Sequence, residues 1–388
     1  MSSVVTDCLA VDSAVWELIA RNWALVSIAT TIVLLVVVPA AVLRRYVRIM
    51  TNLMDDTHPP LSRGVHDSGR IDGEPVSFLA HDGHHLTGTF IWGNSAVARR
   101  GMIIFAHEFK SDRHSALRYC RPLLEAGYDV FSFDFRGHGD SPPESAYKPR
   151  QWPTDREMSD MLGAIAYVGD YLQGAGRGPE IGLFGISRGA GAAILAAARL
   201  SCVTAIVADG AFSSDTIIEY YMKRWATIFA KVRVVAEFHP AIFWTFLRWL
   251  LFGNCSRKFN CRFPSVRKTL RQTQTPILLI HGEKDPYIPY VQSQMLHAEA
   301  RERRSEKDAW LWLVPGAKHN HSVALAPELY GLRTRAFFDV YLAGIAVADD
   351  VRAQTGLSEL THPIARPPRR GAHILSHTRR PANSARRL

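Results

Sequence analysis

One serine in the sequence has the surroundings of a catalytic nucleophile. Ser187 lies between Gly185 and Gly189 in a G-x-S-x-G pattern, after an apolar run and before a run of small residues. A serine between a strand and a helix needs a very tight turn, and glycines two positions away remove the Cβ atoms that would collide there. Such a turn exposes the hydroxyl at the carboxyl end of a sheet, beside a helix N-terminus. The pentapeptide alone is also compatible with a glycine-rich turn that carries an incidental serine.

A serine hydroxyl needs a general base, and the base needs an acid that orients it. Asp285 and His319 supply these groups, and each comes directly after an apolar run with the length of a strand. Because the carboxyl ends of parallel strands share one edge of a sheet, we expect Ser187, Asp285 and His319 to meet at that edge. Two alternatives remain open, namely His321 as the base and Asp209 as the acid.

The apolar runs that position these residues alternate with helix patterns, which indicates an α/β fold. Right-handed crossovers between such runs predict a mostly parallel sheet with helices on both faces. An Asp82-Gly83 hairpin opens the domain, which we expect to span residues 76–346. The expected strands cover residues 76–80, 86–92, 102–106, 130–135, 181–186, 205–209, 276–282 and 310–315, with helices over 154–171 and 326–343.

An insertion separates two of these strands. Residues 213–275 form too long a stretch for an ordinary connection in a compact domain, and they are rich in aromatic and basic residues. We predict a helical lid over the strand ends, with ordinary packing of helices on the sheet as the alternative. Its segment Ile242–Phe252 is unusually apolar, which suits either the roof of an acyl pocket or contact with a bilayer.

The N-terminal region contains the uncharged apolar segment Trp23–Leu43. A helix of roughly 20 residues crosses a bilayer core. A soluble core helix of this length normally has a polar stripe, and a cleaved signal peptide begins with positive charge, whereas Asp7, Asp12 and Glu17 precede this segment. We therefore expect an N-terminal segment over 1–22, a single-pass transmembrane helix over 23–43, and a linker over 44–75.

Charges around this segment predict its orientation. Arg44, Arg45 and Arg48 follow it, and Arg21 precedes it. By the positive-inside rule, the side with more basic residues lies in the cytoplasm. The catalytic domain is therefore predicted to face the cytoplasm.

The net charge of +10 is concentrated near the C-terminus, where arginines gather with no acidic residue beyond Glu359. Such a run is typical of a solvated tail, so we expect a basic disordered tail over 347–388 and no nucleic-acid partner. The five cysteines contain no C-x-x-C pair, which gives no sign of a zinc site or a disulfide framework. We expect neither a metal nor an organic cofactor.

The chain order serine, aspartate, histidine is that of the α/β-hydrolase fold superfamily, and the sequence resembles this superfamily over about residues 76–346. It is most similar to the serine aminopeptidase-like branch and to the membrane-anchored esterase or thioesterase branch. The matching motifs are the Asp-Gly hairpin, Asp134-x-Arg136-Gly137-His138-Gly139-x-Ser141, the G-x-S-x-G turn, Gly282-x-x-Asp285-x-x-Ile288-Pro289 and Pro315-Gly316-Ala317-x-His319.

The resemblance implies a role for each matched residue. Ser187 would attack an acyl carbonyl, His319 would take its proton and return it to the leaving group, and Asp285 would hold the imidazolium. The backbone N–H groups of Arg188 and Phe109 would form the oxyanion hole, each lowering the barrier by about 2.7–4 kcal/mol.

The sequence departs from the family at one position beside this site. Glu108 follows His107 where the family usually has glycine, which leaves the geometry of the Phe109 donor open. A functional acid is one interpretation of Glu108. We expect instead a structural pairing with Arg113 or Lys110.

Together these features predict a membrane-anchored serine hydrolase with a small-molecule acyl substrate. It would cleave carboxylic ester or thioester bonds through an acyl-enzyme intermediate. One alternative is a peptidase or amidase that uses the same triad. The other is a catalytically silent, membrane-tethered binding module.

Overall fold

The computed structural model describes residues 16–17, 20–23, 25–55, 69–229, 241–302 and 308–355. The chain divides into two compact units, one made of Met1–Asp56 and Glu237–Cys255 and the other of Thr57–Ala236 and Ser256–Leu388. The larger unit holds the β-sheet with most of the helices. The smaller unit holds the apolar N-terminal helix and most of helix α8, which spans Ala241–Phe259.

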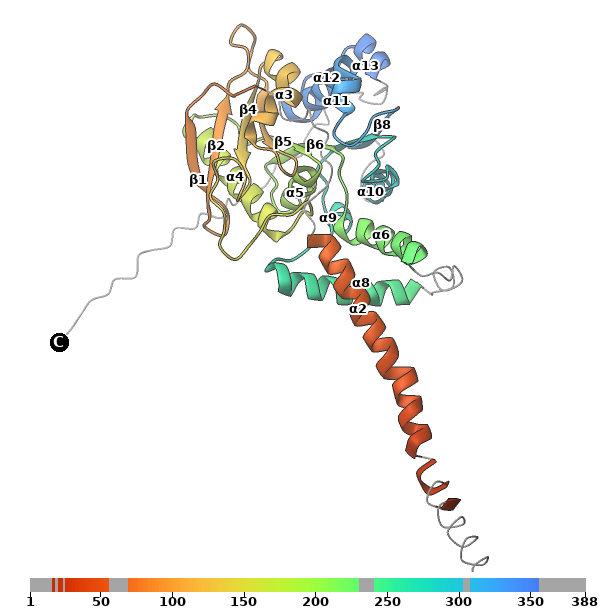
Figure 1. Ribbon diagram of the computed structural model, residues 1–388. Coiled ribbons are helices and arrows are strands. Elements are labelled where there is room, and N and C mark those ends of the chain that lie inside the picture. The colour runs from red at the N-terminus through yellow and green to blue at the C-terminus, as the bar shows by residue number, and fades with distance from the viewer. Residues whose placement is uncertain are drawn as a thin grey trace, which may run out of the picture. The chain divides into compact units, whose positions relative to one another are not determined.

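The larger unit is built on an eight-stranded sheet with the order β1-β2-β4-β3-β5-β6-β7-β8 (Figure 1). The β1–β2 and β2–β4 pairs are antiparallel, and all other neighbours are parallel. This confirms the predicted mostly parallel sheet with a hairpin at one edge. The strands are β1 Pro75–Leu79, β2 His85–Ile91, β3 Gly101–Ala106, β4 Tyr128–Asp134, β5 Ile181–Ile186, β6 Val203–Asp209, β7 Ile277–Gly282 and β8 Ala309–Val314.

Helices cover both faces of the sheet, as the sequence predicts (Figure 1). Alternate residues of a buried strand point to opposite faces, so Ile104 of β3 lies in one hydrophobic cluster and Ile103 in the other. Helices α4 Asp155–Gly174, α5 Arg188–Ala197 and α10 Val291–Arg301 contribute to the first cluster. The second cluster receives α3 Ala116–Glu125, α12 Pro327–Phe338 and the π-turn η4 Asp339–Ala343.

Local sequence explains how α4 starts and how closely it packs. The Thr154 hydroxyl and the Glu157 carboxylate form a capping box at its N-terminus. Gly163 faces β1, where a Cβ atom would lie 2.3 Å from the carbonyl oxygen of Leu79. Any other residue at Gly163 would push α4 away from the sheet edge.

The described part of the insertion between β6 and β7 is helical. It consists of α6 Ser214–Phe229, α8 Ala241–Phe259 and the short α9 Val266–Leu270. Residues 230–240 lie outside the described residues. The helical character is confirmed, whereas the function of the insertion as a lid stays a prediction.

The folded part of the chain extends past the predicted boundary at residue 346. Helix α13 spans Asp349–Thr355, and Val347 and Thr355 are buried. The prediction of a disordered tail from residue 347 was therefore wrong for this stretch, because the arginine-rich composition begins only after it. Residues 356–388 lie outside the described residues.

The smaller unit contains an apolar helix that runs from Ala20 to Asp55, and the described residues of its most apolar stretch are not buried. Its length and composition suffice to cross a membrane, as those of a signal sequence also do. The helix takes the π form over Val33–Val37, which ends two residues before Pro39, a residue that has no N–H to donate to the preceding turn. Helix α2, Val38–Asp55, then continues without interruption.

The continuation of α2 corrects the predicted linker over residues 44–75. Residues 44–55 are helical because no glycine or proline interrupts them and half of them are good helix formers, namely arginine, leucine and methionine. The predicted loop residues 56–68 lie outside the described residues.

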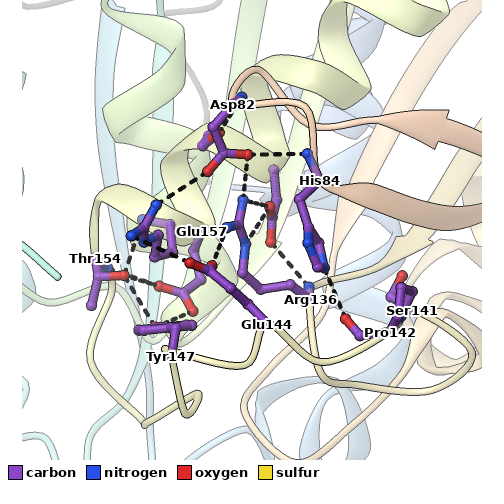
Figure 2. Close-up of polar contacts among 12 residues, drawn as sticks. Asp82, His84, Arg136, Ser141, Pro142, Glu144, Tyr147, Thr154 and Glu157 are labelled. Atoms are coloured by element: carbon purple, nitrogen blue, oxygen red, sulfur yellow. Dashed lines mark hydrogen bonds and ion pairs between the residues drawn. The ribbon is translucent and has the colours of Figure 1, made fainter. Parts of the chain in front are cut away.

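A buried ion-pair cluster, here called the Arg136 cluster, ties the hairpin to α4 (Figure 2). Arg136, which follows β4 and is almost fully buried, donates to Asp160 of α4 at 2.8 Å, to Glu144 at 2.6 Å and to Asp82 at 2.9 Å. Asp82 sits in the turn between β1 and β2. Arg136 therefore braces these turns.

We expect Arg136→Met to lower the free energy of unfolding by about 3–5 kcal/mol, because it leaves the buried Asp160 carboxylate without its partner. Burial raises the pKa of Asp160 to about 6 although Arg136 lowers it. Without Arg136 this pKa rises further. The loss in free energy of unfolding should therefore be largest above about pH 6 and become smaller at lower pH, where Asp160 is protonated. Urea unfolding across this pH range measures the effect.

Arg156 provides the matched control for this prediction. It pairs with Asp82 and Glu144 of the same cluster, but its side chain is 25% exposed. Arg156→Met should cost less than about 1 kcal/mol, because solvent screens such pairs. Equal losses for the two variants would contradict the structural role given to Arg136.

Candidate active site

Ser187 occupies the strained turn between β5 and α5. Its backbone has φ 53° and ψ −113°, a conformation that non-glycine residues seldom adopt. Cβ atoms at Gly185 and Gly189 would lie 2.5 Å from the Cα of Ala190 and 2.2 Å from the carbonyl oxygen of Ala106. The two flanking glycines are therefore required by close backbone approach, and this favours a nucleophile turn over an incidental serine.

His319 lies beside this hydroxyl. It follows β8, and its Nε2 is 3.0 Å from Ser187 Oγ. On its other side, Nδ1 is 2.6 Å from Asp285 Oδ2. With the proton on Nδ1, His319 donates to the Asp285 carboxylate while Nε2 accepts from the Ser187 hydroxyl. This is the tautomer that a general base needs.

Asp285 is held in a tight loop after β7. Its Oδ1 accepts hydrogen bonds from the backbone N–H groups of Tyr287 at 2.9 Å and Ile288 at 2.8 Å. Burial alone would raise the pKa of Asp285, but the charge of His319 and hydrogen bonds from His281 and His319 hold this pKa well below its usual range. Asp285 is therefore ionised at neutral pH and can stabilise an imidazolium.

The alternative acid, Asp209, lies at the end of β6 and makes different contacts. Its carboxylate accepts from the Tyr330 hydroxyl at 3.0 Å and the Ser322 hydroxyl at 3.4 Å. Its backbone carbonyl accepts from the N–H of Ser187 at 2.7 Å. The structure thus brings Asp285 to the imidazole and places Asp209 where it fixes the strand behind the turn.

The alternative base, His321, is the N-cap residue of the short helix α11, Ser322–Leu325. The ring nitrogen within hydrogen-bond distance of Ser187 belongs to His319 instead. Asn320 between the two histidines has φ 57°, which turns the chain sharply after His319.

Asp209→Asn gives a direct test that separates the two aspartates. Burial raises the pKa of Asp209 from 3.8 to about 6. A carboxyl group whose pKa is higher in the folded than in the unfolded protein stabilises the folded state below the unfolded pKa. This stability is lost as the pH rises through the folded pKa. Asparagine avoids the burial of this charge, so the variant should be more stable than wild type at neutral pH, by on the order of 1–3 kcal/mol.

This gain should vanish near pH 4 and level off above about pH 7, which urea unfolding at several pH values measures. Esterase activity should stay within several-fold of wild type. A loss of activity as large as that of an Asp285 variant would make Asp209 the orienting acid and overturn the assignment.

The predicted oxyanion donors lie on the two segments beside Ser187. Arg188 is the first residue of α5, and Phe109 lies in the loop after β3. The fully buried guanidinium of Arg188 lies 5.1 Å from the ring centroid of Phe109. The backbone N–H of Arg188 therefore lies at the helix N-terminus, and its side chain packs against the loop that contains Phe109.

Two buried histidines beside these segments stay neutral and hold the segments in place. His107 accepts from the N–H of Phe135 at 3.1 Å and donates to the Glu108 carbonyl at 2.7 Å. Burial, together with the charge of Arg188, lowers the pKa of His107 to about 3, and the same causes lower the pKa of His138. His138 Nε2 can thus accept from Arg188 Nη2 at 3.3 Å.

One of the two pairings expected for Glu108, the one with Arg113, is not formed. Arg113 instead forms ion pairs with Asp134 and Asp140. Glu108 is buried, its Oε2 lies 3.4 Å from the Ser115 hydroxyl, and burial raises its pKa. The departure from the family therefore places a carboxyl inside the loop core.

His281 is the residue near the site that the sequence interpretation missed. It is fully buried at the end of β7, and its ring nitrogens contact the Ser293 hydroxyl at 2.6 Å and the Ile288 carbonyl at 2.8 Å. It also lies 3.4 Å from the Asp285 carboxylate. A histidine that ends an otherwise apolar strand was the available signal for this role in holding the Asp285 loop.

Several known proteins resemble this chain in sequence. It is 25% identical to the lysophosphatidylserine lipase ABHD12 of Macaca fascicularis over 249 residues, which are 62% of this chain and 56% of that protein. It is 26% identical to the uncharacterized protein YfhR of Salmonella typhi over 249 residues, covering 61% of this chain and 72% of that protein.

Solved structures share its fold. The esterase Pf2001 of Pyrococcus furiosus superposes with a TM-score of 0.50 at 23% identity, covering 70% of this chain and 94% of the esterase. The acylaminoacyl peptidase of Pyrococcus horikoshii gives a TM-score of 0.51 at 16% identity, over 74% of this chain and 44% of the peptidase. At these identities the likeness shows the fold alone.

The family comparison covers the sheet from within β3 to β8, the nucleophile turn and the loops that carry Asp285 and His319. Residues 103–331, more than half of the sequence, match the model of the alpha/beta hydrolase family. The chain therefore belongs to the alpha/beta hydrolase family.

Proposed function

We propose that the protein is a membrane-anchored serine hydrolase that cleaves carboxylic ester or thioester bonds of a small-molecule acyl substrate. The observation that supports this most strongly is the continuous contact from Ser187 Oγ to His319 at 3.0 Å and from His319 to Asp285 at 2.6 Å. A nucleophile, its base and an ionised orienting acid are the parts that acyl transfer requires.

In the first half of the proposed reaction, Ser187 Oγ attacks the acyl carbonyl carbon while His319 Nε2 takes the hydroxyl proton. The tetrahedral oxyanion is stabilised by the N–H groups of Arg188 and Phe109. The bond to the alcohol or thiol then breaks, and His319 returns its proton to that leaving group. The product of this half is an acyl-enzyme on Ser187.

Water completes the cycle through the same groups. His319 removes a proton from the water as it attacks the acyl-enzyme, and the second tetrahedral oxyanion uses the same two donors. Collapse of this intermediate expels Ser187 Oγ, which regains the proton from His319. Asp285 carries its negative charge throughout and stabilises each imidazolium.

Two further observations support a lipidic acyl substrate and a membrane location. One relative is named as a lysophosphatidylserine lipase, an enzyme class that acts on a lipid acyl ester. The apolar helix Ala20–Asp55 is long enough to anchor the chain in the same membrane. The exposed Arg44, Arg45 and Arg48 after the apolar segment favour a cytoplasmic catalytic unit.

A substrate panel tests this proposal on the full-length protein in detergent. Acyl esters of p-nitrophenol with increasing chain length, the matching coenzyme A thioesters and aminoacyl anilides would be compared by kcat/KM. We expect turnover of esters or thioesters with a preference for longer chains, and little turnover of anilides. Preferential anilide turnover would favour the peptidase alternative. If the folded protein turns over none of these substrates and its serine does not react with a fluorophosphonate probe, the binding module is favoured.

A further inference from the structure

Helix α8 is apolar on two opposite faces. Trp244, Leu247 and Leu251 recur at helical spacing and are buried, each at most 4% exposed. On the opposite side, Ile242 is 75% exposed, Phe246 49% and Trp249 69%. A helix that packs through one face normally presents polar residues on the other, and an apolar outer face indicates an apolar surrounding.

The exposed side chains, here called the outer face of α8, form an ordered aromatic surface. The rings of Phe246 and Trp249 stack with centroids 6.1 Å apart and planes at 24°. Tryptophan is the residue that proteins place at the boundary between headgroups and acyl chains, because its ring is amphipathic. The outer face therefore has the composition of an interfacial membrane surface rather than that of a water-exposed helix.

Contacts within the smaller unit join α8 to the proposed anchor. Asn254 Nδ2 donates to Thr51 Oγ1 at 2.8 Å, and Cys255 Sγ lies 3.5 Å from Met54 Sδ. Figure 1 shows α8 crossing α2 near these residues. The helix that α8 crosses is thus the one that carries the apolar segment. The crossing point lies after the C-terminal end of that segment.

The distance along α2 places α8 near the bilayer surface. Thr51 lies eight positions after Leu43, the end of the apolar segment, and at 1.5 Å per residue this is about 12 Å along the helix. The headgroup zone extends roughly 5–8 Å beyond the hydrocarbon core, and a helix with its side chains has a radius of about 5–6 Å. Exposed Arg44, Arg45 and Arg48 lie between the two points, where they suit anionic headgroups.

We propose that α8 lies on the membrane surface, with Ile242, Phe246 and Trp249 inserted among the headgroups of the leaflet that α2 enters. The occupant of the outer face is thus the phospholipid bilayer. This inference rests on the proposed anchoring by α2. It adds a second membrane contact from the insertion, which would limit rotation and tilting of the anchor relative to the bilayer.

The test is quenching of tryptophan fluorescence by brominated lipids. Full-length protein is reconstituted into vesicles of phosphatidylcholine and phosphatidylglycerol in equal parts, with bromine on the phosphatidylcholine acyl chains. The emission of each tryptophan is obtained as wild type minus variant, for Trp249→Phe, Trp244→Phe and Trp23→Phe. Trp249 should be quenched several-fold more than Trp244, most strongly by bromines near the headgroup.

The other variants separate the possible failures. Trp244 is on the packed face of the same helix and serves as the matched control, and Trp92, 47% exposed after β2, replaces it if that variant misfolds. Quenching of Trp23 without quenching of Trp249 would overturn the inference and leave the anchor intact. If neither is quenched, the anchoring proposal fails as well. An unquenched Trp249 whose emission changes with protein density would assign the outer face to a second copy of the chain, which also overturns the inference.

Discussion

Ser187→Ala is expected to reduce kcat for acyl ester hydrolysis by about four to six orders of magnitude, leaving only the rate supported by substrate binding and the oxyanion donors. The alanine removes the oxygen that lies 3.0 Å from His319 Nε2, so no acyl-enzyme can form. Labelling by a fluorophosphonate probe, which forms a bond to an activated serine oxygen, should disappear in parallel. Initial-rate kinetics and gel fluorescence measure the two effects.

Ser201→Ala is the matched control, because Ser201 is exposed in the turn before β6 and lies on no segment of the site. It should retain wild-type rate and labelling. Circular dichroism of both variants shows whether the fold is intact. A folded Ser187→Ala protein that still hydrolyses esters at the wild-type rate would exclude Ser187 as the nucleophile and with it the proposed mechanism.

Asp285→Asn is expected to reduce kcat by about four orders of magnitude, although the side chain keeps its size. The asparagine can present its N–H₂ group to His319 Nδ1, which favours the imidazole tautomer whose Nε2 is protonated and cannot accept the Ser187 proton. It also removes the charge that stabilises the imidazolium. Fluorophosphonate labelling should become slow but remain detectable, since Ser187 is still present.

The pH dependence of stability, compared between wild type and Asp285→Asn, provides a second test of the role of Asp285. Because its pKa is held well below the usual range, Asp285 contributes stability above its unfolded pKa of about 4, and this contribution is lost only as the pH falls through the lower folded value. The stability deficit of Asp285→Asn should therefore shrink as the pH falls into strong acid. A kcat deficit smaller than that of Asp209→Asn would contradict the assignment of Asp285.

The strand pattern of the sequence does not distinguish Asp209 from Asp285 as the orienting acid. Asp209 is the last residue of one buried parallel strand and Asp285 follows another, so strand-end position places both at the same edge and leaves two candidates. The choice depends on which loop bends its carboxylate toward His319. Two backbone N–H donors from Tyr287 and Ile288 orient Asp285, whereas Tyr330 of α12 holds Asp209 in another direction.

The boundaries of the domain were predicted less well than its strands, for a physical reason. Buried strands are read from continuous apolar runs, which burial on both faces imposes. The helix over residues 44–55 and helix α13 have no such pattern, since each buries only part of its surface. Composition alone therefore assigned the first to a linker and the second to a tail.

The sequence by itself determined the fold class, the glycine-flanked turn at Ser187 and the candidates for base and acid, because alternation of apolar runs and close backbone packing leave direct marks in the residue order. Only the tertiary structure decided which aspartate and which histidine meet Ser187, because those contacts depend on the path of three loops that are far apart in the chain. It also decided that Arg188 packs against Phe109 and that Glu108 is buried beside Ser115. These features arise from long-range packing, and no local pattern encodes them.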